Sequence, residues 1–179
     1  MNKDTSGKAT SPMRELRVEK VVVNIGVGDA GEKLSRAEKV IQLITDHKPT
    51  QTLSSHTNKD LGIRIGMPIG CKVTLRKNDA PEFLRKAFAV KENRIMDYSF
   101  DQEGNFSFGI SDYTDFEGMK YDPDIGIFGL DICVVLRRAG KRVKLRKKAR
   151  SHIPHSHRVD RTEAMDWVAK TFDVEVLES

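Results

Sequence analysis

Residues 71–76 read Cys71-Lys72-Val73-Thr74-Leu75-Arg76, a strict alternation of apolar and polar side chains that decides the fold. Successive side chains of a β-strand point to opposite faces, so the three apolar groups share one face and the three polar groups the other. A strand of this kind is typical of an antiparallel sheet with one face packed on the core and one face solvated.

Residues 18–25 and 105–110 alternate in the same way, which would place their apolar side chains on the same covered face. The opposite face then gathers neutral hydrogen-bonding groups and two cations, with no acid among them: Asn24, Lys72, Thr74, Arg76, Asn105 and Ser107. Solvated sheet faces usually carry Glu or Asp as well. We therefore expect this acid-free face to read RNA shape, 2′-hydroxyls and exposed bases.

Apolar stripes and turn residues place the other elements. Helices are expected from a Ser35–Glu38 capping box to about His47, from Asp79 onward, and after Asp160. Strands are expected at 18–25, 50–56, 69–76, 98–100, 105–110 and 129–136. This order predicts an α+β fold, a largely antiparallel sheet with helices packed on one face and the other face open for RNA. We expect a disordered tail over 1–12 and one domain over 13–179, including a basic arm at 137–161 and a C-terminal helix from about 161.

The positive charge is concentrated in the basic arm. Its eleven Lys and Arg residues face a single acid, Asp160, so the arm carries +10 while the whole chain carries +5 and the remainder −5. Such an excess repels itself unless a polyanion neutralises it. The arm residues expected to bind rRNA phosphates are Arg137, Arg138, Lys141, Arg142, Lys144, Arg146, Lys147, Lys148 and Arg150.

Composition excludes several classes of protein. Charged residues make up 32% of the chain and apolar residues 38%, and no stretch approaches the roughly 20 apolar residues that span a bilayer. The first twelve residues lack the apolar segment of a secretory signal. Cys71 and Cys133, the only cysteines, are expected to be reduced thiols and not a disulfide framework.

Two motifs point to other functions. Gly26-Val27-Gly28-Asp29-Ala30-Gly31 matches a dinucleotide-binding fingerprint, but the capping box at Ser35 would separate it from its helix. The three histidines in 152–157 lack a thiol or carboxylate nearby to hold a metal among so many cations. No catalytic constellation is evident, so we expect a non-enzymatic protein without cofactors. An NAD-type enzyme and a protein-interaction module that binds an acidic partner through the arm remain the alternatives.

The decapeptide Met67-Pro68-Ile69-Gly70-Cys71-Lys72-Val73-Thr74-Leu75-Arg76 resembles the signature of the universal large-subunit ribosomal protein five family, which binds 5S rRNA. Further matches follow in the family's order at 22–28, 94–98, 100–107 and 129–132. The segment after Arg137 is similar to the archaeal and eukaryotic form of the family.

This resemblance implies a cytoplasmic structural protein of the large ribosomal subunit that helps attach 5S rRNA in the central protuberance. It implies 23S rRNA and neighbouring large-subunit proteins as further partners, with no membrane and no small-molecule substrate. The family's 5S-binding face corresponds to Asn24, Thr52, Thr74, Arg76, Asn105 and Ser107, which largely coincides with the polar face above. The loop that can reach P-site tRNA corresponds to His56, Thr57, Asn58, Lys59, Leu61 and Gly62. The chain departs from the family at Lys77, where Gly is usual, and in the low positive charge of this loop.

Overall fold

A computed structural model of the chain describes residues 11–177, so most of the predicted tail, residues 1–10, lies outside the described part. Five strands form one antiparallel sheet in the order β2-β3-β1-β6-β5. Their bounds are β1 Leu16–Gly26, β2 Thr50–Leu53, β3 Pro68–Leu75, β5 Phe106–Ile110 and β6 Leu130–Arg138. The helices are α1 Glu32–Thr45, α2 Asp79–Val90, α3 Arg142–Leu145 and α4 Arg161–Phe172. Two short strands, β4 Arg94–Met96 and β7 Glu175–Leu177, pair in parallel in a second sheet.

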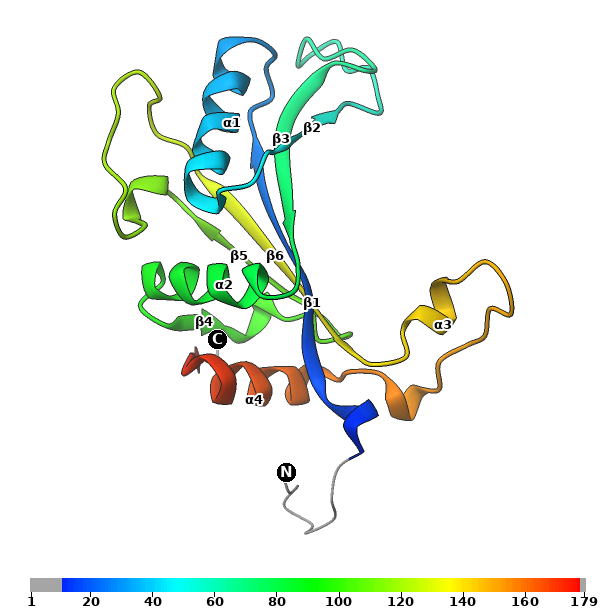
Figure 1. Cartoon of the computed structure of the whole chain (residues 1–179). Coiled ribbons are helices and arrows are strands. Elements are labelled where there is room, and N and C mark those ends of the chain that lie inside the picture. Colours follow the sequence, from blue (N-terminus) through cyan, green and yellow to red (C-terminus); the bar gives the residue numbers. More distant parts are fainter. Residues whose placement is uncertain (1–10, 178–179) are drawn as a thin grey trace.

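The predicted sidedness of the sheet is confirmed. Helices α1 and α2 lie against one side of it, and no helix from residues 11–177 packs on the other side (Figure 1). The apolar side chains of β1, β3 and β6 alternate as expected and are buried under the helices: Val21, Val23, Ile25, Cys71, Val73, Leu75, Leu130, Ile132, Val134 and Leu136. At the β5 edge, Phe88 of α2 stacks on Phe108 at 5.5 Å between ring centroids and meets Phe172 of α4 at 5.3 Å. The α+β fold follows from this single covered face.

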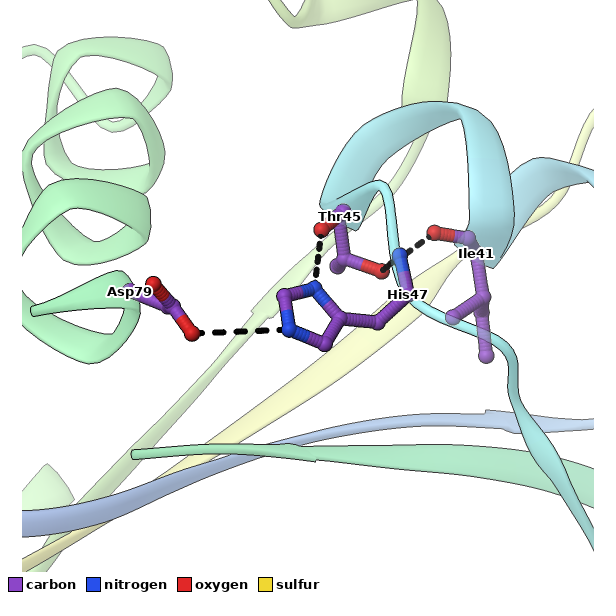
Figure 2. A network of polar contacts seen from close by, with 4 residues as sticks. All are labelled: Ile41, Thr45, His47 and Asp79. Carbon is purple, nitrogen blue, oxygen red and sulfur yellow. Dashed lines mark hydrogen bonds and ion pairs between the residues drawn. The ribbon is translucent and has the colours of Figure 1, made fainter. Parts of the chain in front are cut away.

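A short polar network joins the end of α1 to the start of α2 (Figure 2). Thr45 is buried, and its hydroxyl donates to the carbonyl of Ile41 at 2.7 Å. The ring of His47 lies between the two helices, with Nδ1 2.6 Å from the carbonyl oxygen of Thr45 and Nε2 3.4 Å from a carboxylate oxygen of Asp79. The network links the end of one covering helix to the start of the other on the same face.

The predicted start of α1 is wrong. The helix begins at Glu32 with Gly31 as its N-cap at φ 115°, and Ser35 lies in the first turn, its hydroxyl 3.5 Å from the Gly31 carbonyl. The glycine motif therefore does lead directly into a helix, and its separation from the helix no longer argues against dinucleotide binding. The sheet excludes that fold instead, because β1 is antiparallel to both of its neighbours, whereas a dinucleotide fold needs parallel strands.

Two other predicted elements differ from the structure. Residues 97–99 form a 3₁₀ turn, not a strand, and the neighbouring strand is β4, which pairs with β7 at the far end of the chain. Strand β2 ends at Leu53, three residues earlier than expected. Lys77 adopts a left-handed conformation with φ 55°, for which glycine is the favoured residue.

Candidate nucleic-acid interface

The side of the sheet without helices, called the open face below, consists of side chains aligned in rows across the strands. Residues paired in register lie on the same face of neighbouring strands, about 4.8 Å apart. The first row is Thr50, Lys72, Asn24, Asp131 and Gly109, and the second row is Thr74, Val22, Cys133 and Ser107. Arg76 lies just beyond the end of β3 and is exposed. The sheet thus brings four of the predicted site residues into two adjacent rows.

The polar groups of these rows are available to a ligand. Within residues 11–177, no side-chain hydrogen bond or ion pair involves Asn24, Lys72, Thr74, Arg76 or Ser107. All of them except the half-buried Asn24 are exposed. Backbone hydrogen bonds between the strands hold Asn24, Lys72, Thr74 and Ser107 in place. The spacing between the points where their side chains leave the sheet is therefore set before any ligand binds.

The expectation of an acid-free face is wrong. Asp131 stands in the first row opposite Asn24, and its Oδ1 would lie 3.8 Å from a Cβ placed on Gly109. Cys133 stands exposed in the second row. The alternation of apolar side chains in the predicted strand 129–136 contained the signal for both positions, but the open face was derived from the other three strands alone. A carboxylate accepts hydrogen bonds from base amino groups and 2′-hydroxyls and repels phosphates.

A hollow of about 850 Å³ lies over the β5 side of the open face. Asn24, Ser107, Asp131 and Cys133 form part of its floor. Its wall comes from outside the five-stranded sheet, with the cations Lys91 and Arg94 and the strongly exposed ring of Tyr98. None of these wall residues was predicted as part of the site, because the chain between α2 and β5 carries no pattern that reveals where it folds. An aromatic ring beside cations and hydrogen-bonding groups is a combination that suits an unstacked base.

Asn105 and Thr52 are placed differently from the other site residues. Asn105 precedes β5, its side-chain amide donates to Asp101 at 2.8 Å, and its Oδ1 is buried without a hydrogen-bond partner within the described chain. Thr52 is half-buried opposite Gly70. The backbone packs so closely there that a Cβ added to Gly70 would lie 2.9 Å from the Thr52 hydroxyl and 2.7 Å from the carbonyl oxygen of Ile25. The structure therefore ties Asn105 to a turn and places Thr52 at the edge of the rows.

The basic arm leaves the end of β6 and projects away from helices α1 and α2, carrying the short helix α3 (Figure 1). Two acids from elsewhere in the chain neutralise its base: Glu19 contacts Arg137 at 3.2 Å and Lys141 at 3.6 Å, and Glu163 pairs with the mostly buried Arg138. The cations farther along are exposed and have no ion pair within residues 11–177: Arg142, Lys144, Arg146, Lys147, Lys148 and Arg150. Of the predicted arm residues, three therefore hold the arm to the fold and six remain free to meet phosphates.

The predicted tRNA-contact loop lies between β2 and β3, at the opposite end of the sheet from the arm (Figure 1). Asn58 and Ile63 exchange backbone hydrogen bonds of 2.8 and 2.9 Å, which closes the loop into a small hairpin. The tip carries the exposed Leu61, at 68%, and Ile65, just after the hairpin, is 70% exposed. The structure places all six predicted residues of this loop on the surface.

The histidines of the arm belong to its internal contacts. His157 Nε2 lies 2.8 Å from the carbonyl oxygen of Ala139, and His152 Nε2 lies 3.0 Å from the guanidinium of Arg158. Among the described residues, no three His, Cys, Asp or Glu side chains gather in a way that could hold a metal ion. In the same part of the chain, no helix is long and apolar enough to cross a membrane.

One helix-covered face, one open face of aligned hydrogen-bonding groups and a cationic arm beside it are the features expected of a protein that binds RNA on a sheet. Comparison with known proteins makes this specific. The family model "Ribosomal protein L5" matches residues 11–64, and the model of the C-terminus of the same ribosomal family matches residues 68–167. The chain therefore belongs to the ribosomal protein L5 family, which is structural and non-enzymatic.

Similar proteins come from archaea, which confirms the archaeal type of the chain. The "Large ribosomal subunit protein uL5" of Thermoplasma volcanium is 56% identical over 92% of this chain and 98% of its own length. That of Thermoplasma acidophilum is 56% identical over 93% and 99%, and one from Methanococcus maripaludis is 50% identical over 93% of each chain. The similarity thus covers the open face, the loop and the basic arm together.

Proposed function

We propose that this chain is a structural constituent of the cytoplasmic large ribosomal subunit that binds 5S rRNA on its open face and helps attach it in the central protuberance. The observation that carries the proposal is the register that aligns Asn24, Lys72, Thr74 and Ser107, with no hydrogen bonds of their own side chains within the described chain. An irregular RNA loop offers 2′-hydroxyls and base edges to such a platform. The names of the similar proteins support assembly into the large subunit.

Charge along the rows favours one orientation of the RNA. Lys72 and Arg76 lie on the β3 side, whereas Asp131 lies on the β6 side next to the hollow that contains Tyr98. Phosphates are attracted to the first pair and repelled by the carboxylate. Phosphates therefore lie near β3 or near Lys91 and Arg94 at the wall of the hollow, and bases or ribose hydroxyls lie over Asp131 between them.

A gel-shift panel tests the proposal, with 5S rRNA, tRNA and an unrelated structured RNA as probes. Thr74→Val removes one hydrogen-bonding group and should weaken 5S binding by about 0.5–1.5 kcal/mol, and Arg76→Gln by about 1.5–3 kcal/mol because that bond is charge-assisted. Thr171→Val and Arg85→Gln make the same changes at exposed positions on helices α4 and α2 and should have no effect. An equal loss on all three RNAs would contradict specific binding by the open face.

The basic arm supplies affinity in this proposal, by contacts to phosphates of 5S or 23S rRNA. If six to ten phosphates are engaged, the binding constant should fall by about 10³–10⁵ between 50 and 200 mM salt. Each substitution such as Lys147→Gln should reduce the slope of log K against log salt by about one. A salt response that stays flat would contradict the role of the arm. Retention on ribosomal subunits through a high-salt wash would argue against a free protein-interaction module.

The loop at 56–62 is proposed to reach the elbow of P-site tRNA. Its hairpin closure and its exposed apolar tip support a contact made by shape, since Lys59 is its only lysine. Replacing Leu61 with Ser should weaken tRNA binding to the subunit and leave 5S binding unchanged. Loss of 5S binding in that variant would instead connect the loop to the open face.

A further inference from the structure

A small cavity of about 70 Å³ lies where the basic arm folds back on the end of β6. Two segments of the arm line it, 137–144 and 152–159. They are held together by the 2.8 Å contact of His157 with Ala139 and by a 3.2 Å hydrogen bond from the amide of Ser151 to the carbonyl of Val143. The polar residues that line the cavity are almost all basic: Arg137, Arg138, Lys141, Lys144, His152, His157 and Arg158, with Glu103 as the only acid.

Within residues 11–177, the acids that pair with or line this cavity do not balance its charge. Five Lys and Arg residues line it. Glu19 pairs with Arg137 and Lys141, and Glu163 pairs with Arg138. Together with the lining Glu103, these acids supply three negative charges against five positive ones, which leaves a net charge of +2 with the histidines neutral. Like charges so close together in a cavity partly shielded from water raise the energy of the folded arm.

The unbalanced cations are identifiable. Neither Lys144 nor Arg158 forms an ion pair within residues 11–177, although Arg158 donates to His152. The Nε–H of Arg138 is buried without a hydrogen-bond partner in the same part of the chain. Buried donors in folded proteins are normally satisfied by protein, water or ligand. All three residues line the cavity, where acceptors from residues 11–177 leave part of their hydrogen-bonding capacity unused.

The size and charge of the cavity suit a small anion. At roughly 10–15 Å³ for each water-sized position, its volume of about 70 Å³ holds about five to seven such positions, enough for the five heavy atoms of one phosphate group. We infer that this cavity is a binding site for one tetrahedral oxyanion, either inorganic phosphate or a backbone phosphate of RNA. The RNA source rests on the proposed function, whereas the site for the inorganic ion does not.

The experiment uses the full chain and inorganic phosphate, titrated by calorimetry at constant ionic strength. The wild type should bind one phosphate, and Lys144→Gln and Arg158→Gln should each weaken binding about 10-fold or more. Lys39→Gln is the matched control, because Lys39 is an exposed cation on helix α1 that neither lines the cavity nor belongs to the basic arm. Chymotryptic cleavage after the exposed Leu145 provides a second readout, and phosphate should slow it in the wild type and the control but not in the two cavity variants.

Titration with 5S rRNA identifies the source of the oxyanion. If an RNA phosphate occupies the cavity, saturating phosphate should weaken RNA binding to the wild type more than to Arg158→Gln. If phosphate binds as described but does not compete with RNA, the site takes a free ion. If the wild type binds phosphate no better than the two cavity variants do, the inference is overturned, whatever Thr74→Val does to 5S binding.

Discussion

Alkylation of Cys133 measures directly whether RNA covers the open face. Its thiol is exposed in the second row, directly opposite Val22 and Ser107. Cys71 lies on the helix-covered face, and burial, together with the nearby negative charge of Glu38, raises the pKa of its thiol to about 11. At pH 8, about one Cys71 side chain in a thousand is then the reactive thiolate, and the helices shield even that fraction.

N-ethylmaleimide should therefore add one group to the free protein, at Cys133. With 5S rRNA present at 100 times its dissociation constant, about 1% of the protein is unbound, so the alkylation rate of Cys133 should fall by about 100-fold. An unrelated RNA at the same concentration should leave most of the rate intact. Mass spectrometry of tryptic peptides after timed quenching measures both cysteines in one sample.

The converse experiment starts from the modified protein. The adduct on Cys133 covers Val22 and Ser107, which lie about 5 Å away on the neighbouring strands. It should abolish the preference for 5S rRNA and keep the salt-dependent, non-specific binding of the basic arm. Cys133→Ser removes the reactive group and should keep full binding after treatment with the reagent. An undiminished alkylation rate at saturating 5S rRNA would refute the assignment of the open face, and rapid labelling of Cys71 in the folded protein would refute the assigned packing of β3.

Three predictions concern stability, measured by urea denaturation. Gly104→Ala should destabilise the protein by about 2–4 kcal/mol, because Gly104 has φ 74° and an added Cβ would lie 2.6 Å from a methyl group of Val159; a loss below about 0.5 kcal/mol would contradict this packing. Lys77→Gly should stabilise the protein by about 0.5–1 kcal/mol, because glycine adopts the left-handed conformation without strain. Lys91→Gly should not stabilise it, because Lys91 has an ordinary φ of −88°. A destabilised Lys77→Gly variant would show that the lysine side chain itself contributes to stability. The pKa of Cys71 is higher in the folded than in the unfolded protein. The contribution of its protonated thiol to the free energy of unfolding is therefore fully present below about pH 8.5 and is lost as the pH rises towards 11. The advantage of the wild type over Cys71→Ala should therefore shrink by about 1–3 kcal/mol across that range, and a constant difference would argue against the raised pKa.

Much of the candidate site could be predicted because a strand has a side-chain period of two. Residues 71–76 alternate without exception, so the hydrophobic effect assigns Thr74 to the open face whatever the partner strands are. The arm was equally evident, since consecutive cations without acids need no structure to be recognised. The resemblance to the ribosomal protein family rested on the same stretches and is confirmed by the comparisons.

Local signals failed where two conformations suit the same residues. A Ser35–Glu38 pair fits a capping box and also fits the interior of a helix, and the choice depends on Gly31, whose φ of 115° no pattern indicates. Strand β4 was missed because three residues acquire strand geometry only by pairing with β7 at the other end of the chain.

The sequence by itself determined which side chains face the helices, where the cations gather and which family the chain belongs to, because these depend on neighbouring residues along the chain. Only the tertiary structure decided that Asp131 stands opposite Asn24, that Tyr98 borders the open face, and that Glu19 and Glu163 neutralise the base of the arm. Register and electrostatic pairing join residues far apart in sequence, and the free energy that selects them is gained only when the whole sheet is formed.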